Sequence, residues 1–172
     1  MVFSGVFTRS DRTTVSKAAA LAERLTQQYF NLPEAEWERN PYGIFTCKEV
    51  GTRFYQPDVF AHIIRYPSKA GRCHQKQRER YGVLLQDPNI LLALLRSASH
   101  DLWTLGLFIL THELVHIVRF TKYNVDFFAG VSGRAKEENL VQGVTKDILA
   151  GVTNIDHVLS LYDKQAELLR NA

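Results

Sequence analysis

The apolar positions in the first fifty residues predict one long helix followed by a short strand. Apolar and small residues recur at helical spacing over 14–30, and Pro33 then ends the pattern. The stretch 33–43 is polar and rich in turn-forming residues, so we expect a loop there. Residues 43–50 are expected to include a short strand.

Two further strand patterns are separated by a basic stretch. Residues 59–66 and 80–86 are rich in β-branched and aromatic side chains, which predicts an antiparallel hairpin. Six Lys and Arg residues lie between positions 65 and 80 and could contact phosphate groups. Aromatic residues occur there only at the margins, so we favour a solvated loop over a nucleic-acid interface.

The second half of the chain reads as helical. Asp87 and Pro88 predict the N-cap and first turn of a helix that reaches about position 97. Ser99 or Asp101 caps the next helix, which runs to about position 121. This helix is apolar on nearly every side, so we expect it to be the central buried helix.

Two more helices are predicted after a loop at 122–134 that contains two glycines. The first covers 135–150, and the last begins after Thr153 or Asn154. The order of elements predicts an α+β domain, with an N-terminal helix, a small antiparallel sheet and a helical half that holds the buried helix.

The composition is that of one globular domain, so we expect residues 1–172 to form a single unit. Apolar residues make up 45% of the chain and charged residues 23%, with a formal net charge of only +3. The chain shows no signal-peptide pattern and no apolar segment of bilayer length, so we expect a cytoplasmic protein without a membrane partner. Cys47 and Cys73 do not make a disulfide framework.

The candidate chemistry lies in the stretch THELVHIVRF at 111–120. His112 and His116 are four residues apart, so on a helix they share one face and can hold one metal ion. Zn²⁺ accepts two imidazoles together with a third protein ligand and a water molecule. Glu113 follows the first histidine and can take a proton from that water. A lone core histidine is more often only hydrogen-bonded, but two histidines and a glutamate at this spacing favour zinc.

With these residues the chain resembles the zincin metallopeptidases, which share the pattern HExxH. Metzincins continue to HExxHxxGxxH, but Arg119 and Lys122 stand at the last two positions here, which excludes that branch. The remaining resemblance is to gluzincins, whose third zinc ligand is a glutamate on a following helix. It implies a zincin-like fold, a Zn²⁺ cofactor and a peptide or protein substrate.

Glu137 and Glu138 are the candidates for that third ligand. The helix that they open is expected to bury Leu140, Val141, Val144 and Ile148. Glu137 falls at the centre of this stripe, so it is favoured, with Glu138 as the alternative. Gluzincins often place an Asp or Asn four residues after the ligand to orient a zinc histidine. Val141 and Gln142 occupy these positions here, so the outer partners of the histidines differ from the family's.

The sequence therefore predicts a small zinc metallopeptidase. His112, His116 and Glu137 (or Glu138) would hold zinc, Glu113 would act as the general base, and His157, Tyr162 or Tyr123 could donate to the oxyanion. The main alternative is a zincin-derived regulatory or binding module, with a structural or vestigial zinc site and a DNA or protein partner. A metal-free helical interaction protein is the third interpretation.

Overall fold

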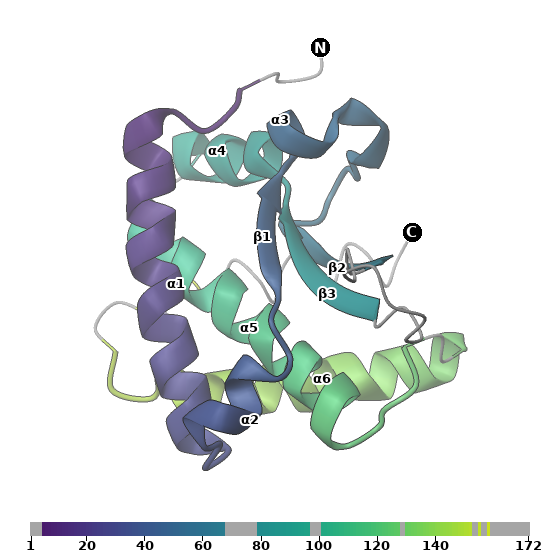
Figure 1. Ribbon diagram of the computed structural model, residues 1–172. Helices are drawn as coiled ribbons and strands as arrows, with labels where there is room; N and C mark the ends of the chain where they lie inside the picture. Colours follow the sequence, from purple (N-terminus) through teal and green to yellow (C-terminus); the bar gives the residue numbers. More distant parts are fainter. Residues whose placement is uncertain are drawn as a thin grey trace, which may run out of the picture.

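The computed structural model describes residues 5–67, 79–96, 101–127, 130–152, 155 and 158 (Figure 1). The elements in chain order are α1 (Arg9–Tyr29), α2 (Glu34–Glu38), β1 (Gly43–Thr46), α3 (Cys47–Val50), the 3₁₀ turn η1 (Thr52–Phe54), β2 (Ala61–Pro67), β3 (Glu79–Leu85), α4 (Asp87–Arg96), α5 (Leu102–Lys122) and α6 (Val131–Leu149). The predicted α+β class, with an N-terminal helix and a helical second half, is confirmed.

The three described strands form one sheet in the order β1-β3-β2. β2 and β3 are antiparallel, with Ile63 opposite Val83, as the hairpin pattern predicted. β1 runs parallel to β3, with Ile44 opposite Val83, so the sheet is mixed and the prediction of a wholly antiparallel sheet is wrong. The pattern of a four-residue strand does not record its partner or direction, which depend on where the chain enters the sheet.

α5 is the centre of the molecule, as the sequence predicted. It lies between α1 on one side and the sheet on the other, and α6 also packs against it (Figure 1). α1 approaches it with the small side chains Ala18, Ala19 and Ala22, which are buried. α5 is long and apolar enough to span a membrane by length and composition, but 83% of its most apolar window is buried inside the protein. Neighbouring elements therefore already cover its apolar surface.

Helix caps explain where several elements begin. α1 starts at Arg9, earlier than expected, because Thr8 and Asp11 form a capping box that satisfies backbone N–H groups at the helix start. Thr46 and Glu49 form a second one, which ends β1 and opens α3 inside the stretch predicted as a strand. Asp101 caps α5 as expected and accepts from Thr104 N at 2.9 Å.

Some predicted boundaries differ from the structure. The expected loop at 33–43 contains the short helix α2. α6 begins at Val131, four residues before the predicted start. Asp87 is the first residue of α4 rather than its cap, and it accepts from the backbone N–H groups of Phe7 and Cys47. Positions 68–78 of the basic stretch lie outside the described residues, and the predicted last helix is described only at two buried helical residues, Ile155 and Val158.

Candidate metal centre

The middle of α5 carries three ionisable side chains that are almost entirely buried. His112, Glu113 and His116 keep 2%, 5% and 7% of their surface exposed, and the helix around them is apolar. The two histidines share one face of α5 because residues four apart lie about one turn apart. Ionisable groups in such a place need partners.

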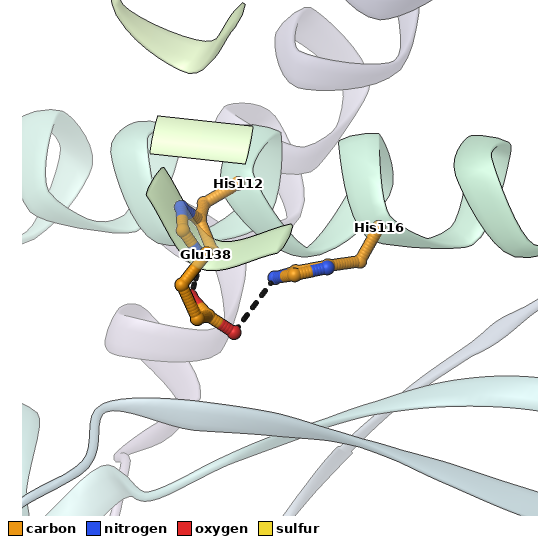
Figure 2. A group of neighbouring side chains, drawn as sticks. All are labelled: His112, His116 and Glu138. Atoms are coloured by element: carbon orange, nitrogen blue, oxygen red, sulfur yellow. Dashed lines mark hydrogen bonds and ion pairs between the residues drawn. The ribbon is translucent and has the colours of Figure 1, made fainter. Parts of the chain in front are cut away.

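Glu138 of α6 lies between the two histidines (Figure 2). Its Oε2 is 3.2 Å from Nε2 of His112, and its Oε1 is 3.2 Å from Nε2 of His116. One ligand atom from each of the three residues can be chosen so that all lie within 4.8 Å of one another. The fold thus brings the histidine pair of one helix together with a carboxylate of the next.

The structure reverses the order that the sequence favoured for the two glutamates. Glu137 faces Arg119, whose Nε and Nη2 donate to its two carboxylate oxygens at 2.5 and 2.8 Å. Its side chain is 13% exposed, against 57% for Glu138. Glu137 does lie on the buried side of the helix, where it pairs with Arg119. Glu138 is the residue beside both histidines.

The buried face of α6 explains the reversal. The stripe used for the prediction included Leu140, which is 43% exposed, and omitted Thr145, which is fully buried. The Thr145 hydroxyl donates to the carbonyl oxygen of Val141 at 2.8 Å, so it needs no water. Val144 is also only partly buried, whereas Leu149 is fully buried. With Thr145 and Leu149 in place of Leu140 and Val144, the centre of the buried face turns toward Glu138 by about two thirds of the roughly 100° step between neighbouring residues.

The contacts with the histidines set the charge of Glu138. Burial raises the pKa of this carboxyl, but the hydrogen bonds from His112 and His116 outweigh it and hold the pKa well below its ordinary value. Burial lowers the pKa of His116, but the hydrogen bond to Glu138 and the surrounding carboxylates outweigh that effect and raise it. Glu138 is therefore ionised at neutral pH, as a metal-ligating carboxylate is.

Glu113 has a different environment from Glu138. Burial raises the pKa of Glu113, the nearby histidines oppose the rise, and the charge of Glu138 adds to it. The side chain lines the same cleft as the two histidines. A carboxyl whose pKa is raised is better suited to accept and return a proton near pH 7 than an ordinary one.

The donor set fits a divalent metal ion. A tetrahedral ion with nitrogen and oxygen ligands at ~2.0–2.1 Å separates neighbouring ligand atoms by about 3.3 Å. Each histidine Nε2 lies 3.2 Å from a different oxygen of Glu138, close to that value, and one ligand atom from each of the three residues lies within 4.8 Å of the other two. Two imidazoles and one carboxylate are also the donors of a common open zinc site. In such a site the Nε2 atoms, which face Glu138, would bind the ion.

A cleft of about 540 Å³ adjoins the cluster. Its walls come from residues 56–63, the middle of α5 and the first turns of α6. β2 is an edge strand of the described sheet, so its free edge is available along the cleft beside the histidines. Phe120 and Phe127 give the wall an apolar part, and the Phe120 ring stacks on His116 with centroids 5.7 Å apart.

His62 of β2 also lines the cleft, and the sequence analysis did not single it out. Its Nδ1 lies 3.3 Å from Nε2 of Gln86, and burial lowers its pKa, so the ring is neutral at neutral pH. A single histidine in a strand has no spacing relative to the HExxH helix that would have indicated its place. Only the pairing of β2 with β3 brings it there.

Of the other residues weighed from the sequence, the structure describes Tyr123 and Cys47, and neither lines the cleft. Tyr123 is 52% exposed, packs against Phe30 with ring centroids 6.1 Å apart, and is not among the described residues that line the cleft. His157 and Tyr162, the other expected oxyanion donors, lie outside the described residues, as does Cys73. Cys47 is buried, with its thiol 3.1 Å from Oε1 of Gln86.

Comparisons with models of protein families, with curated proteins and with solved structures found no match to this chain. Conclusions about function therefore depend on the geometry of the cluster and the cleft.

Proposed function

We propose that the protein is a zinc-dependent metallopeptidase in which His112, His116 and Glu138 hold the ion. The observation that carries the proposal is the convergence of the two histidines with an ionised carboxylate. A further carboxylate, Glu113, lies buried on the same helix, and a purely structural zinc site does not need one. The HExxH pattern and a glutamate on a following helix also match the gluzincin resemblance, with Glu138 in place of the favoured Glu137.

A bound zinc ion would supply Lewis-acid polarisation of a peptide carbonyl and lower the pKa of a water molecule. Glu113 would take a proton from water as the oxygen adds to the carbonyl carbon, and would return the proton to the leaving amine nitrogen. Its raised pKa supports both transfers, because the carboxyl must be ionised before the first and protonated before the second. Glu138 and the histidines would stay in place throughout.

The cleft supports an extended peptide as the substrate. The carbonyl of Phe60 accepts from Gln86 N at 2.8 Å, so Phe60 bonds inward to the neighbouring segment. Hydrogen-bonded and non-hydrogen-bonded pairs alternate along an antiparallel ladder, so the backbone groups of Ala61 and Ile63 face the free edge of β2. An added strand can pair with such an edge. We expect the substrate backbone to bind at this edge.

The cytoplasmic location that the sequence suggested stays a prediction.

The first test is metal content together with peptide hydrolysis. Protein purified without chelator should contain one zinc per chain, and His112→Ala should lose it, because an imidazole ligand is removed. Glu113→Gln should keep zinc but lose at least ~10²-fold in hydrolysis of a peptide library read by mass spectrometry, because it removes the general base.

Glu38→Gln, the same substitution at an exposed position of α2, is the control and should cut the library like the parent. If the parent binds no zinc, the metal site is wrong. If parent and Glu113→Gln both hold zinc and leave the library equally uncut, the peptidase proposal fails and a regulatory or binding role replaces it.

A further inference from the structure

The imidazole of His116 lies between the two neighbouring glutamates of α6. Its Nε2 is 3.2 Å from Oε1 of Glu138, and its Nδ1 is 3.9 Å from Oε1 of Glu137. The side chain is 8% exposed, and Nδ1 is buried and has no hydrogen-bond partner among the described residues. The two nitrogens of one ring therefore face two different carboxylates.

Metal binding at Nε2 determines where the proton of this ring must be. A neutral imidazole has one N–H, so an ion on Nε2 leaves that proton on Nδ1. A buried N–H without an acceptor is costly. The carboxylate oxygen that faces Nδ1 is Oε1 of Glu137, and it must approach by roughly 1 Å to reach the ordinary hydrogen-bond distance of about 2.9 Å.

Glu137 is itself held by a two-point contact with the helix that carries the histidines. Arg119 follows His116 by three residues, and its guanidinium donates to both oxygens of Glu137. A planar guanidinium that donates twice fixes the orientation of a carboxylate and not only its distance. Because Glu137 precedes Glu138, the same contact also fixes how α6 is turned about its axis, and so where Glu138 points.

We propose that Glu137 is a positioning residue of the metal site, held by Arg119, that accepts the Nδ1 proton of His116 and keeps α6 in the orientation that presents Glu138. The inference depends on the proposed zinc site. Glu137 would then contact the zinc ligand His116, and its neighbour Glu138 would bind the ion directly. Val141 and Gln142, which stand four residues after the two glutamates, offer no carboxylate to a zinc histidine. Glu137 would supply that partner instead.

The test compares zinc affinity among purified full-length variants, measured by competition with a chromophoric chelator. Glu137→Leu removes the acceptor and the ion pair, and should weaken zinc binding 10- to 100-fold. Glu137→Gln keeps one acceptor oxygen and should recover part of that loss. Arg119→Met keeps the Glu137 carboxylate but removes the two hydrogen bonds that orient it, and should weaken zinc binding less than Glu137→Leu. Glu138→Gln removes a charged ligand and should weaken binding more than any of these.

Lys122→Met is the matched control, because Lys122 lies on the same helix and pairs with Glu36 at 3.6 Å, away from the site. It should bind zinc within about twofold of the parent. The proposal requires weaker zinc binding in Glu137 and Arg119 variants whose circular dichroism matches the parent's, which separates a loss of positioning from a general loss of structure.

A second readout does not depend on any variant that might fail to fold. In the zinc-loaded parent, ¹H–¹⁵N spectra of the histidine rings should show the Nδ1 proton of His116 as a hydrogen-bonded, slowly exchanging signal. Its absence overturns the proposal, as does a folded Glu137→Leu variant that binds zinc as tightly as the parent. A parent that binds no zinc overturns the metal site itself, which distinguishes that failure from a failure of this inference.

Discussion

Several buried polar side chains on α5 meet a polar partner. The hydroxyl of Thr111 donates to the carbonyl oxygen of Leu107 at 2.8 Å, and His112 and His116 meet Glu138. At the start of the helix Asp101 accepts from both the N–H and the hydroxyl of Thr104, at 2.9 and 2.7 Å. Each contact satisfies a group that burial or the helix end would otherwise leave without a hydrogen bond.

The Asp101 cap gives a prediction with a pH dependence. Asp101→Ala removes both contacts with Thr104 and should lower the free energy of unfolding by about 1 kcal/mol at pH 7. Burial raises the pKa of Asp101, but the hydrogen bonds from Thr104 outweigh it and lower the pKa below its ordinary value of 3.8. The contribution of the charged cap is therefore fully present above pH 3.8 and is lost as the pH falls through the lowered pKa.

Urea denaturation of parent and variant at neutral and acid pH measures this effect. The difference between them should shrink at acid pH. Asp101→Asn, which keeps a good cap without the charge, should stay within a few tenths of a kcal/mol of the parent at pH 7. Equal stabilities of parent and Asp101→Ala at neutral pH would contradict the assignment of Asp101 as the cap.

Among the elements, glycines in the sheet and in α6 have different surroundings. Gly43 of β1 and Gly82 of β3 are paired in the sheet, and the ring of Phe45 lies over both of them. A Cβ on Gly82 would come within 2.7 Å of that ring and 3.1 Å of Tyr66. Phe45 and Tyr66 pack edge to face at 5.5 Å, so neither ring can move without disturbing the other. Gly143 of α6 is exposed, and a Cβ there would meet nothing within 4 Å.

The same substitution should therefore have opposite effects in the two elements. Gly82→Ala should destabilise the protein by about 1–3 kcal/mol, because it overpacks the aromatic pair. Gly143→Ala should stabilise it by about 0.5–1 kcal/mol, because alanine loses less backbone entropy than glycine in a helix. Thermal denaturation measures both, and a stabilised Gly82→Ala variant would show that the rings move aside at no cost.

In the whole molecule, one buried carboxylate joins three distant segments. Asp87 is fully buried, and its two oxygens accept from Phe7 N at 3.2 Å and Cys47 N at 3.0 Å. It thereby ties the segment before α1 and the start of α3 to the start of α4. The neighbouring Gln86 accepts from Gln56 N at 3.0 Å and donates to the carbonyl oxygen of Phe54 at 3.2 Å, which fixes the connection that leads into β2.

Asp87→Asn tests this connection at nearly constant volume. One acceptor oxygen becomes an NH₂ group that faces a backbone N–H, so we expect a loss of about 1.5–3 kcal/mol in the free energy of unfolding. Asp147→Asn, on the exposed side of α6, is the control and should change it by less than about 0.5 kcal/mol. Urea denaturation measures both, and equal losses in the two variants would argue against a special role for Asp87.

The sequence by itself determined the features that are local. Helical periodicity identified α1 and the apolar sequence identified the buried α5. Two strand-forming stretches on either side of a basic segment identified the β2–β3 hairpin, and the four-residue spacing put His112 and His116 on one face. Each of these follows from the backbone geometry of a single element or a neighbouring pair. The prediction of one long, central buried helix carrying the histidine pair required no knowledge of what surrounds it.

Only the tertiary structure decided which groups meet across elements. It made β1 parallel to β3, placed the edge strand β2 at the cleft, and set Glu138 rather than Glu137 between the histidines. Neighbouring helix positions differ by roughly 100°, so the choice between the two glutamates depended on which face of α6 is buried. Hydrophobicity favours Leu140. The packing of α6 instead buries Thr145, whose hydroxyl is satisfied within its own helix, and leaves Leu140 at the surface.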